Sequence, residues 1–286
     1  CKAGVVGSFP ALNARPESML DEWIHQITEE LAAWDRDHPE TPAAPFAVNQ
    51  IVYRTNVRLQ HDMEVCVKRK VPIVISSLGA RPEVNDAVHS YGGVTLHDVI
   101  NVNHARKAIE KGADGVIAVA AGAGGHAGMQ SPFALIQEIR AWFDGPLVLS
   151  GAIATGRAVL AAQAAGADLG YIGSAFIATE EANASAAYKQ AIVEGTASDI
   201  VYTRFFTGVH GNYLKSSIVA SGLDPDRLEG LDPTTMDFGA ASGAKVWRDI
   251  WGSGQGIGAV DAVIPAAAFV DRLAREYAEA KAALCG

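Results

Sequence analysis

The chain has 286 residues, 49% of them hydrophobic, and its 32 acidic and 23 basic side chains give a formal net charge of −9. This length is enough to bury a full hydrophobic core, and the acidic balance argues against nucleic acid or an anionic membrane surface as the main partner. The three cysteines have no metal-ligand spacing, and no apolar run reaches the ~18–20 residues of a membrane span, so we expect a cytoplasmic protein with free thiols, no metal and no membrane segment.

Short apolar runs rich in Val and Ile alternate with amphipathic stretches along the first two thirds of the chain. This alternation predicts strand–helix units around a parallel sheet. The predicted strands cover 4–9, 46–51, 72–76, 93–96, 114–119, 146–150 and 169–173. The predicted helices cover about 17–36, 57–69, 81–89, 103–111, 131–142, 156–165 and 179–194.

Seven strands suit a doubly wound sheet, whereas a TIM barrel needs eight. The chain opens inside a strand-like segment just after Cys1, and we therefore predict an α/β fold, a TIM (β/α)8 barrel whose first strand lies upstream of Cys1. From about residue 195 the rhythm breaks into a stretch rich in Gly, Ser, Thr, Asp and Pro, with one helix-like segment near 212–221. We predict a barrel formed by 1–194 and 246–286, with a smaller lobe of 195–245 over its mouth. An Ala-rich amphipathic helix is predicted over 264–284.

Two consecutive strand ends are small and glycine-rich. Ser150-Gly151-Ala152 follows the sixth predicted strand and Gly173-Ser174 ends the seventh. Ligands bind at the carboxyl ends of parallel strands, and main-chain N–H groups before a helix can hold a phosphate without a basic side chain. The sequence therefore indicates a phosphate site at these two turns; the alternative is a tightly packed glycine corner.

A third strand end holds a single histidine among glycines. Residues 120–128 contain four glycines around His126, and His126 is the only titratable side chain between Asp114 and Glu138. An ordinary histidine pKa near ~6.5 suits a general base, so we predict that His126 is catalytic rather than structural. His97 follows another predicted strand and either shapes the same site or caps a loop. His210 lies in the predicted lobe and either reaches the substrate or belongs to a surface loop.

Other cofactor signatures are absent from the sequence. It contains no GxxxxGK[ST] loop, no GxSxG elbow and no cluster with metal-ligand spacing. These absences favour a cofactor anchored through its phosphate.

Several segments together resemble the nitronate monooxygenase family, formerly called 2-nitropropane dioxygenases. The run 121–128 is similar to its GGHxG motif, and Phe46-Ala47-Val48-Asn49 to its F-x-V-N strand. The segments 146–153, 166–176 and 254–258 are similar to its P-V-I-A-A-G-G-I, G-A-x-x-V-x-x-G-T-x-F and G-Q-G-x-G motifs. The motifs occur in the same order and cover about residues 1–260.

This resemblance implies a TIM barrel with a smaller lobe and FMN as the cofactor. It implies that His126 is the catalytic base or orienting group. The residues that it places at the FMN are Asn49, Gly124, Gly125, Ser150, Gly151, Ala152, Tyr171, Ile172, Gly173 and Ser174.

Three functions stay open at this point. The first is oxidation of a small-molecule nitronate with O2, giving a carbonyl compound and nitrite. The second is an NAD(P)H-dependent flavin reductase, since enoyl-acyl-carrier-protein reductases and quinone reductases share the superfamily. The third is a barrel that binds a phosphorylated metabolite without redox chemistry. Assembly into a homo-oligomer is also left open.

Overall fold

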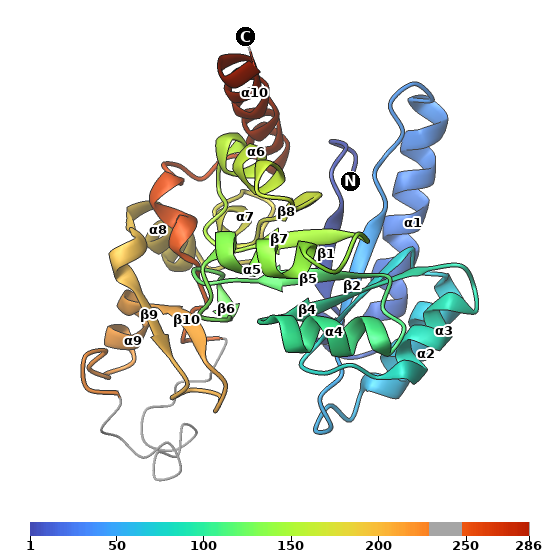
Figure 1. Cartoon of the computed structure of the whole chain (residues 1–286), viewed down its shortest axis with the longest axis horizontal. Coiled ribbons are helices and arrows are strands. Elements are labelled where there is room, and N and C mark those ends of the chain that lie inside the picture. The colour runs from blue at the N-terminus through green and yellow to red at the C-terminus, as the bar shows by residue number, and fades with distance from the viewer. Residues whose placement is uncertain (229–247, 286) are drawn as a thin grey trace. The chain divides into compact units, whose positions relative to one another are not determined.

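The computed structural model describes residues 1–228 and 248–285, which form two compact units (Figure 1). The first unit comprises residues 1–117 and 143–147, and the second comprises 118–142 and 148–286. The predicted lobe, 195–245, falls in the second unit, and its last part from residue 229 lies outside the described residues.

The strands of the main sheet follow one another in chain order. The sheet order is β1-β2-β3-β4-β5-β7-β8. The strands are β1 (Gly7–Pro10), β2 (Phe46–Ile51), β3 (Ile73–Ser77), β4 (Val94–Val99), β5 (Gly115–Val119), β7 (Leu147–Ser150) and β8 (Leu169–Tyr171). Each begins and ends within three residues of a predicted strand. The α/β prediction is confirmed, and this succession of strands and helices is that of a TIM barrel.

The first unit packs four helices against its strands. The helices are α1 (Met19–Asp37), α2 (Leu59–Arg69), α3 (Pro82–His89) and α4 (Val102–Glu110). Pro82 begins α3, where a missing N–H costs nothing, and the Asn101 side chain caps α4 by accepting a hydrogen bond from the amide of His104. Leu20 and Ile24 of α1 are fully buried in the core of this unit, because the apolar residues of the helix recur on one face.

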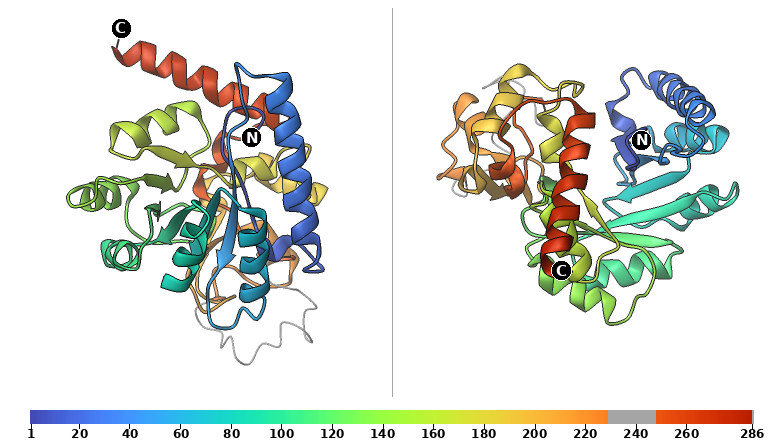
Figure 2. Two further views of the ribbon diagram at one scale, coloured as in Figure 1. Left: turned by 90° about the vertical axis from the view of Figure 1, so that its right-hand side faces the viewer. Right: turned by 90° about the horizontal axis from the view of Figure 1, so that it is seen from above.

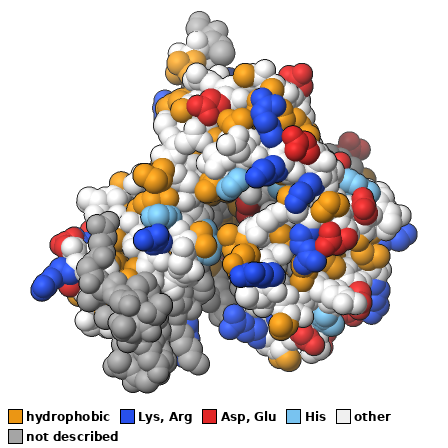
Figure 3. Space-filling model, turned by 60° about the horizontal axis from the view of Figure 1, so that its bottom comes forward, with side chains coloured by type: hydrophobic (Ala, Val, Ile, Leu, Met, Phe, Trp, Pro, Cys, Tyr) orange, Lys and Arg blue, Asp and Glu red, His pale blue; other side chains and the backbone are white. Residues whose placement is uncertain are grey.

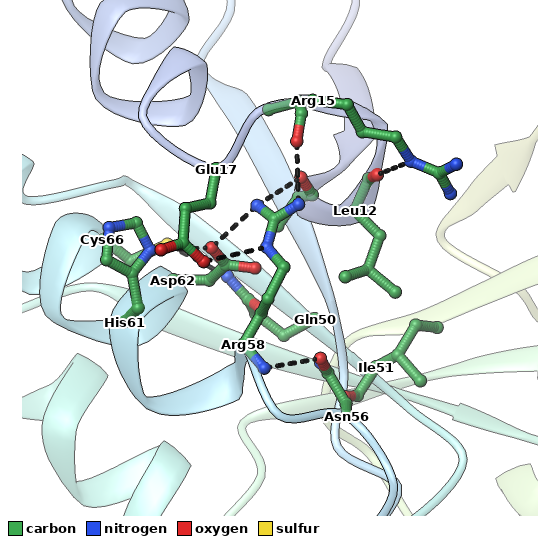
Figure 4. A network of polar contacts seen from close by, with 12 residues as sticks. Leu12, Arg15, Glu17, Gln50, Ile51, Asn56, Arg58, His61, Asp62 and Cys66 are labelled. Carbon is green, nitrogen blue, oxygen red and sulfur yellow. Dashed lines mark hydrogen bonds and ion pairs between the residues drawn. The ribbon is translucent and has the colours of Figure 1, made fainter.

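A buried charge network holds the loop after β1 in this unit (Figure 4). The Arg58 guanidinium donates to the carbonyl oxygens of Ala14 at 2.7 Å and Ala11 at 3.3 Å, and to Asp62 Oδ1 at 2.9 Å. The Asp62 side chain is 0% exposed. Arg58 therefore satisfies two main-chain acceptors and a buried carboxylate at once, which fixes the 3-10 turn η1 (Ala11–Asn13).

The second unit adds a small antiparallel sheet to its helices. Strand β6 (Gly125–His126) pairs with β10 (Gly211–Leu214), which pairs with β9 (Ile200–Thr203). The helices are α5 (Pro132–Arg140), α6 (Gly156–Ala164), α7 (Ser174–Ile177), α8 (Ala186–Glu194), α9 (Lys215–Ala220) and α10 (Ala266–Cys285), with 3-10 turns η2 (Ala197–Asp199) and η4 (Gln255–Ala259).

Two helices in this unit are shorter than predicted. Within the predicted range 179–194, α8 begins only at Ala186, where the Ser185 side chain caps its first turn. The helix-like stretch at 212–221 begins as strand β10, whose residues pair with β9 before α9 starts. Cross-strand pairing outweighs the weak local preference for helix there.

The C-terminal helix α10 packs along α6, as Figure 2 shows. A Cβ on Gly156 would collide with the main chain of α10 at Leu273 and Tyr277, so only glycine permits this approach. Among the described residues, no helix combines the length and apolarity that crossing a bilayer requires. On the face drawn in Figure 3, acidic and basic side chains of the described residues are interspersed.

Candidate active site

Strand ends and glycine-rich segments of the second unit enclose a cavity of about 280 Å³. Its walls come from the loop after β5, the ends of β7 and β8, helix α8 and the segment before η4. The lining residues are Gly122, Ala123, Gly124, Gly125, Ser150, Gly151, Ala152, Ile153, Ala154, Tyr171, Gly173, Ser174, Ala175, Ile177, Tyr188, Gly252, Gly254 and Gly256. The two predicted phosphate turns, at Gly151 and Gly173, therefore line one cavity.

Main-chain hydrogen bonds tie three of these segments together. The Gly122 carbonyl accepts from the amides of Ala152 at 3.2 Å and Gln255 at 2.9 Å. A Cβ on Gly254 would lie 2.5 Å from the Gly122 oxygen and 2.8 Å from the Gly124 nitrogen. Since those atoms belong to the main chain and cannot rotate away, the segments can approach this closely only with glycine at position 254.

The turn after β7 has an unusual backbone. Gly151 has φ +145° and Ala152 has φ +54°, in the left-handed region that disfavours a side chain. A Cβ on Gly151 would lie 2.9 Å from the Ala121 carbonyl oxygen. At the end of β8, by contrast, a Cβ on Gly173 would meet no atom within 4 Å. Gly173 therefore presents an open main-chain surface beside Ser174, whose hydroxyl accepts from the Gly254 amide at 2.8 Å.

Among the residues that the structure describes, those lining the cavity include no charged or histidine side chain. Its polar groups are main-chain amides and carbonyls and the hydroxyls of Ser150, Ser174, Tyr171 and Tyr188. Burial raises the pKa of Tyr188, and this hydroxyl donates to the Gly252 carbonyl. An anion in this cavity would have to be held by main-chain N–H groups and hydroxyls, as phosphates often are.

His126 follows the lining residue Gly125 directly, in strand β6. It is half-buried, and its Nε2 lies 2.8 Å from Thr207 Oγ1. Burial lowers the pKa of the imidazole, because a low dielectric disfavours the cation. The ring is therefore neutral near pH 7, the state that a general base requires.

Eight of the ten predicted cofactor residues line the cavity, and two do not. Ile172 packs in the apolar cluster around Phe269. Asn49 belongs to the first unit, where its amide donates to Ser77 Oγ at 2.6 Å and to the Ile75 carbonyl at 3.3 Å. Ser77 in turn donates to Asp98, and burial raises the pKa of this carboxyl to about 6.

The two other predicted histidines have structural surroundings. His97 is 1% exposed, its Nε2 lies 2.9 Å from Asn85 Oδ1 on α3, and burial lowers its pKa to about 4. A side chain turned toward a helix and sealed from solvent cannot contact a substrate, so the substrate role predicted for His97 is not supported. The exposed His210 stacks on Tyr202, with ring centroids 5.0 Å apart, which fits a surface loop better than a substrate contact.

Sequence reasoning missed the wall formed by Gly252, Gly254 and Gly256. This segment follows no strand, and an isolated glycine run is weak evidence for a site; only its similarity to a family motif pointed to it. Tyr188 was also missed, because nothing local distinguishes it from a packing residue of α8. Among the described residues, no group of three or more His, Cys, Asp or Glu side chains is placed to hold a metal.

Comparison with known proteins gives a family match over most of the chain. Residues 29–276 match the model of the nitronate monooxygenase family. A nitronate monooxygenase of Paraburkholderia phytofirmans is 28% identical over 267 residues, which cover 87% of this chain and 73% of that protein. The chain spans only 48–59% of the length of other curated relatives that it matches.

Two solved structures share the fold over most of both chains. A single-residue mutant of FabK from Thermotoga maritima has a TM-score of 0.71 at 26% identity, covering 90% of this chain and 83% of that one. A nitroalkane oxidase from Streptomyces ansochromogenes has a TM-score of 0.74 at 25% identity, covering 99% and 91%. The family match and these two structures agree with the TIM-barrel fold.

Proposed function

Because the chain belongs to the nitronate monooxygenase family, we propose that it is an FMN-dependent enzyme that oxidises alkyl nitronates with O2 to a carbonyl compound and nitrite. The observation that carries this proposal is the shared cavity. The glycine-rich ends of β7 and β8 and the loop that leads to His126 all line it, so one ligand can meet the two turns and lie beside the imidazole-bearing strand.

The cavity suits the phosphate end of FMN. Gly173 leaves an open main-chain surface, and the turn at Gly151 and Ala152 lies in the same wall. Main-chain amides at strand ends bind phosphates without a cationic side chain. Main-chain N–H groups near Gly151, Gly173 and Ser174 would hold the phosphate.

FMN bound in this cavity would supply the redox chemistry, with electrons going from the substrate to O2. When the neutral nitroalkane is the substrate, the neutral imidazole of His126 would act as the base that accepts its α-proton and so forms the nitronate. The lowered pKa keeps the imidazole in this neutral form.

An absorbance spectrum of the purified protein tests the cofactor, and anaerobic mixing with an alkyl nitronate tests the reaction. We expect flavin bands, bleaching by the nitronate, and release of nitrite when O2 is admitted. A colourless protein that takes up no FMN would overturn the flavin proposal. Bleaching by NADH or NADPH, with none by the nitronate, would replace nitronate oxidation with an NAD(P)H-dependent reductase.

The His126→Gln substitution tests the role of the imidazole. It should lower kcat/KM for the neutral nitroalkane by roughly 10²- to 10⁴-fold, the usual range for a lost general base, while the flavin spectrum stays unchanged. His210→Gln is the matched control and should keep full turnover. Full turnover in His126→Gln would show that His126 is not the base.

A further inference from the structure

We propose that Thr207 is the positioning residue for His126 and that its hydroxyl holds the imidazole with the proton on Nε2. Thr207 lies in the loop between β9 and β10, far from His126 in the sequence. The proposal rests on the proposed function in one respect, namely that it takes His126 as the catalytic residue.

The hydrogen bonds around the Thr207 hydroxyl assign its single proton. Thr207 Oγ1 lies 3.0 Å from the Val209 carbonyl oxygen, and it accepts from the Val209 amide at 3.3 Å. A carbonyl oxygen can only accept, so the hydroxyl proton points to Val209. Toward His126 Nε2, at 2.8 Å, the oxygen then acts as the acceptor. A neutral imidazole that donates from Nε2 carries its acceptor lone pair on Nδ1.

The hairpin that carries Thr207 is fastened to both sides of His126. Gly211 of β10 pairs with His126 of β6, and a Cβ on Gly211 would lie 2.9 Å from the Gly125 carbonyl oxygen. On the other side, the Tyr202 hydroxyl donates to the Ala127 carbonyl at 3.0 Å, and the Ala127 amide donates to the His210 carbonyl at 3.2 Å. Thr207 and the imidazole are therefore held by one rigid framework, as positioning requires.

Nitrogen-15 NMR of the histidine side chains in the purified holoprotein reads the tautomer directly, with His126→Gln identifying the signal. We expect the native protein and Thr207→Ser to carry the neutral proton on Nε2. In Thr207→Val, which is isosteric but lacks the hydroxyl, the tautomers should mix. The pKa of His126 should also fall further in Thr207→Val, because the lost acceptor stabilised the imidazolium more than the neutral ring.

Thr28→Val is the matched control, since it removes a threonine hydroxyl that donates to the Ile24 carbonyl within α1. It should leave the His126 signals unchanged. If Thr207→Val does not fold, Thr207→Ala serves in its place. A native Nδ1–H tautomer, or an unchanged tautomer and titration in the variant, would overturn the proposal.

Kinetics supply the second readout. Thr207→Val should lower kcat/KM for the neutral nitroalkane roughly tenfold, as expected for one lost neutral hydrogen bond, with FMN retained and Thr207→Ser restoring the rate. The NMR result does not depend on turnover. If no nitronate is oxidised but the tautomer responds to Thr207, the proposed function fails and the positioning of His126 stands.

Discussion

Two regions of the molecule hold their loops in different ways. In the first unit, Arg58 and the buried Asp62 fix the loop after β1 through charged hydrogen bonds. In the second unit, the candidate site is held by main-chain contacts between glycines, and its described lining residues carry no charge. The comparison teaches that buried charge fixes a loop of the fold in one region, whereas close main-chain packing shapes the candidate site in the other.

The largest expected effect is on the charged region. Arg58→Met should lower the free energy of unfolding by roughly 3–5 kcal/mol, because it leaves Asp62 buried without its cation. Urea unfolding measures this loss, with Lys2→Met, which breaks an exposed ion pair with Glu30, as the control that should change little. The folded Arg58→Met protein should bind FMN as tightly as the native protein. Weakened FMN binding by this variant would show that the charged network also supports the candidate site.

The next effect is on the glycine region. Gly254→Ala should weaken FMN binding by roughly 10- to 100-fold, the equivalent of about 1–3 kcal/mol of overpacking, because its Cβ would press on the main chain of Gly122 and Gly124. Gly258→Ala is the matched control, since its Cβ would meet only Thr196 at an ordinary 3.9 Å. Fluorescence titration of the apoproteins with FMN compares them. Equal affinities would mean that the close approach of these segments is not needed.

The pH dependence of kcat/KM tests the role proposed for His126. Burial disfavours the His126 cation and lowers its pKa. The imidazole should therefore stay neutral until the pH falls below about 6.5, the ordinary pKa of a histidine. Below its pKa, kcat/KM should fall about tenfold per pH unit. Initial rates with the neutral nitroalkane measure this limb. A midpoint above that ordinary value, or a limb that survives in His126→Gln, would contradict the assignment.

The smallest expected effect concerns salt. Because none of the described residues that line the cavity is charged, raising the ionic strength should change the FMN affinity by less than about twofold, whereas a site built on exposed cations would lose affinity by screening. Titrations at low and high salt compare the two cases. A steep loss of FMN affinity at high salt would indicate that a basic side chain outside this lining binds the phosphate.

Sequence patterns predicted the fold better than the walls of the site. The seven strands could be predicted because they come from short, mostly apolar runs before turns, and Gly151 and Gly173 because they follow such runs. The contact of Gly254 with Gly122 could not be predicted, since the two residues are distant in sequence. For His97 the sequence left two roles open, because a strand-end position does not reveal that the ring turns toward α3.

The most direct test of the account compares the binding of FMN and riboflavin to the apoprotein. The two ligands share the ring system and differ in the phosphate. If main-chain amides near Gly151 and Gly173 hold that phosphate, FMN should bind at least about 100-fold more tightly, as expected for several hydrogen bonds to a charged group. Equal affinity for the two ligands would contradict the claim that this neutral cavity is a phosphate site.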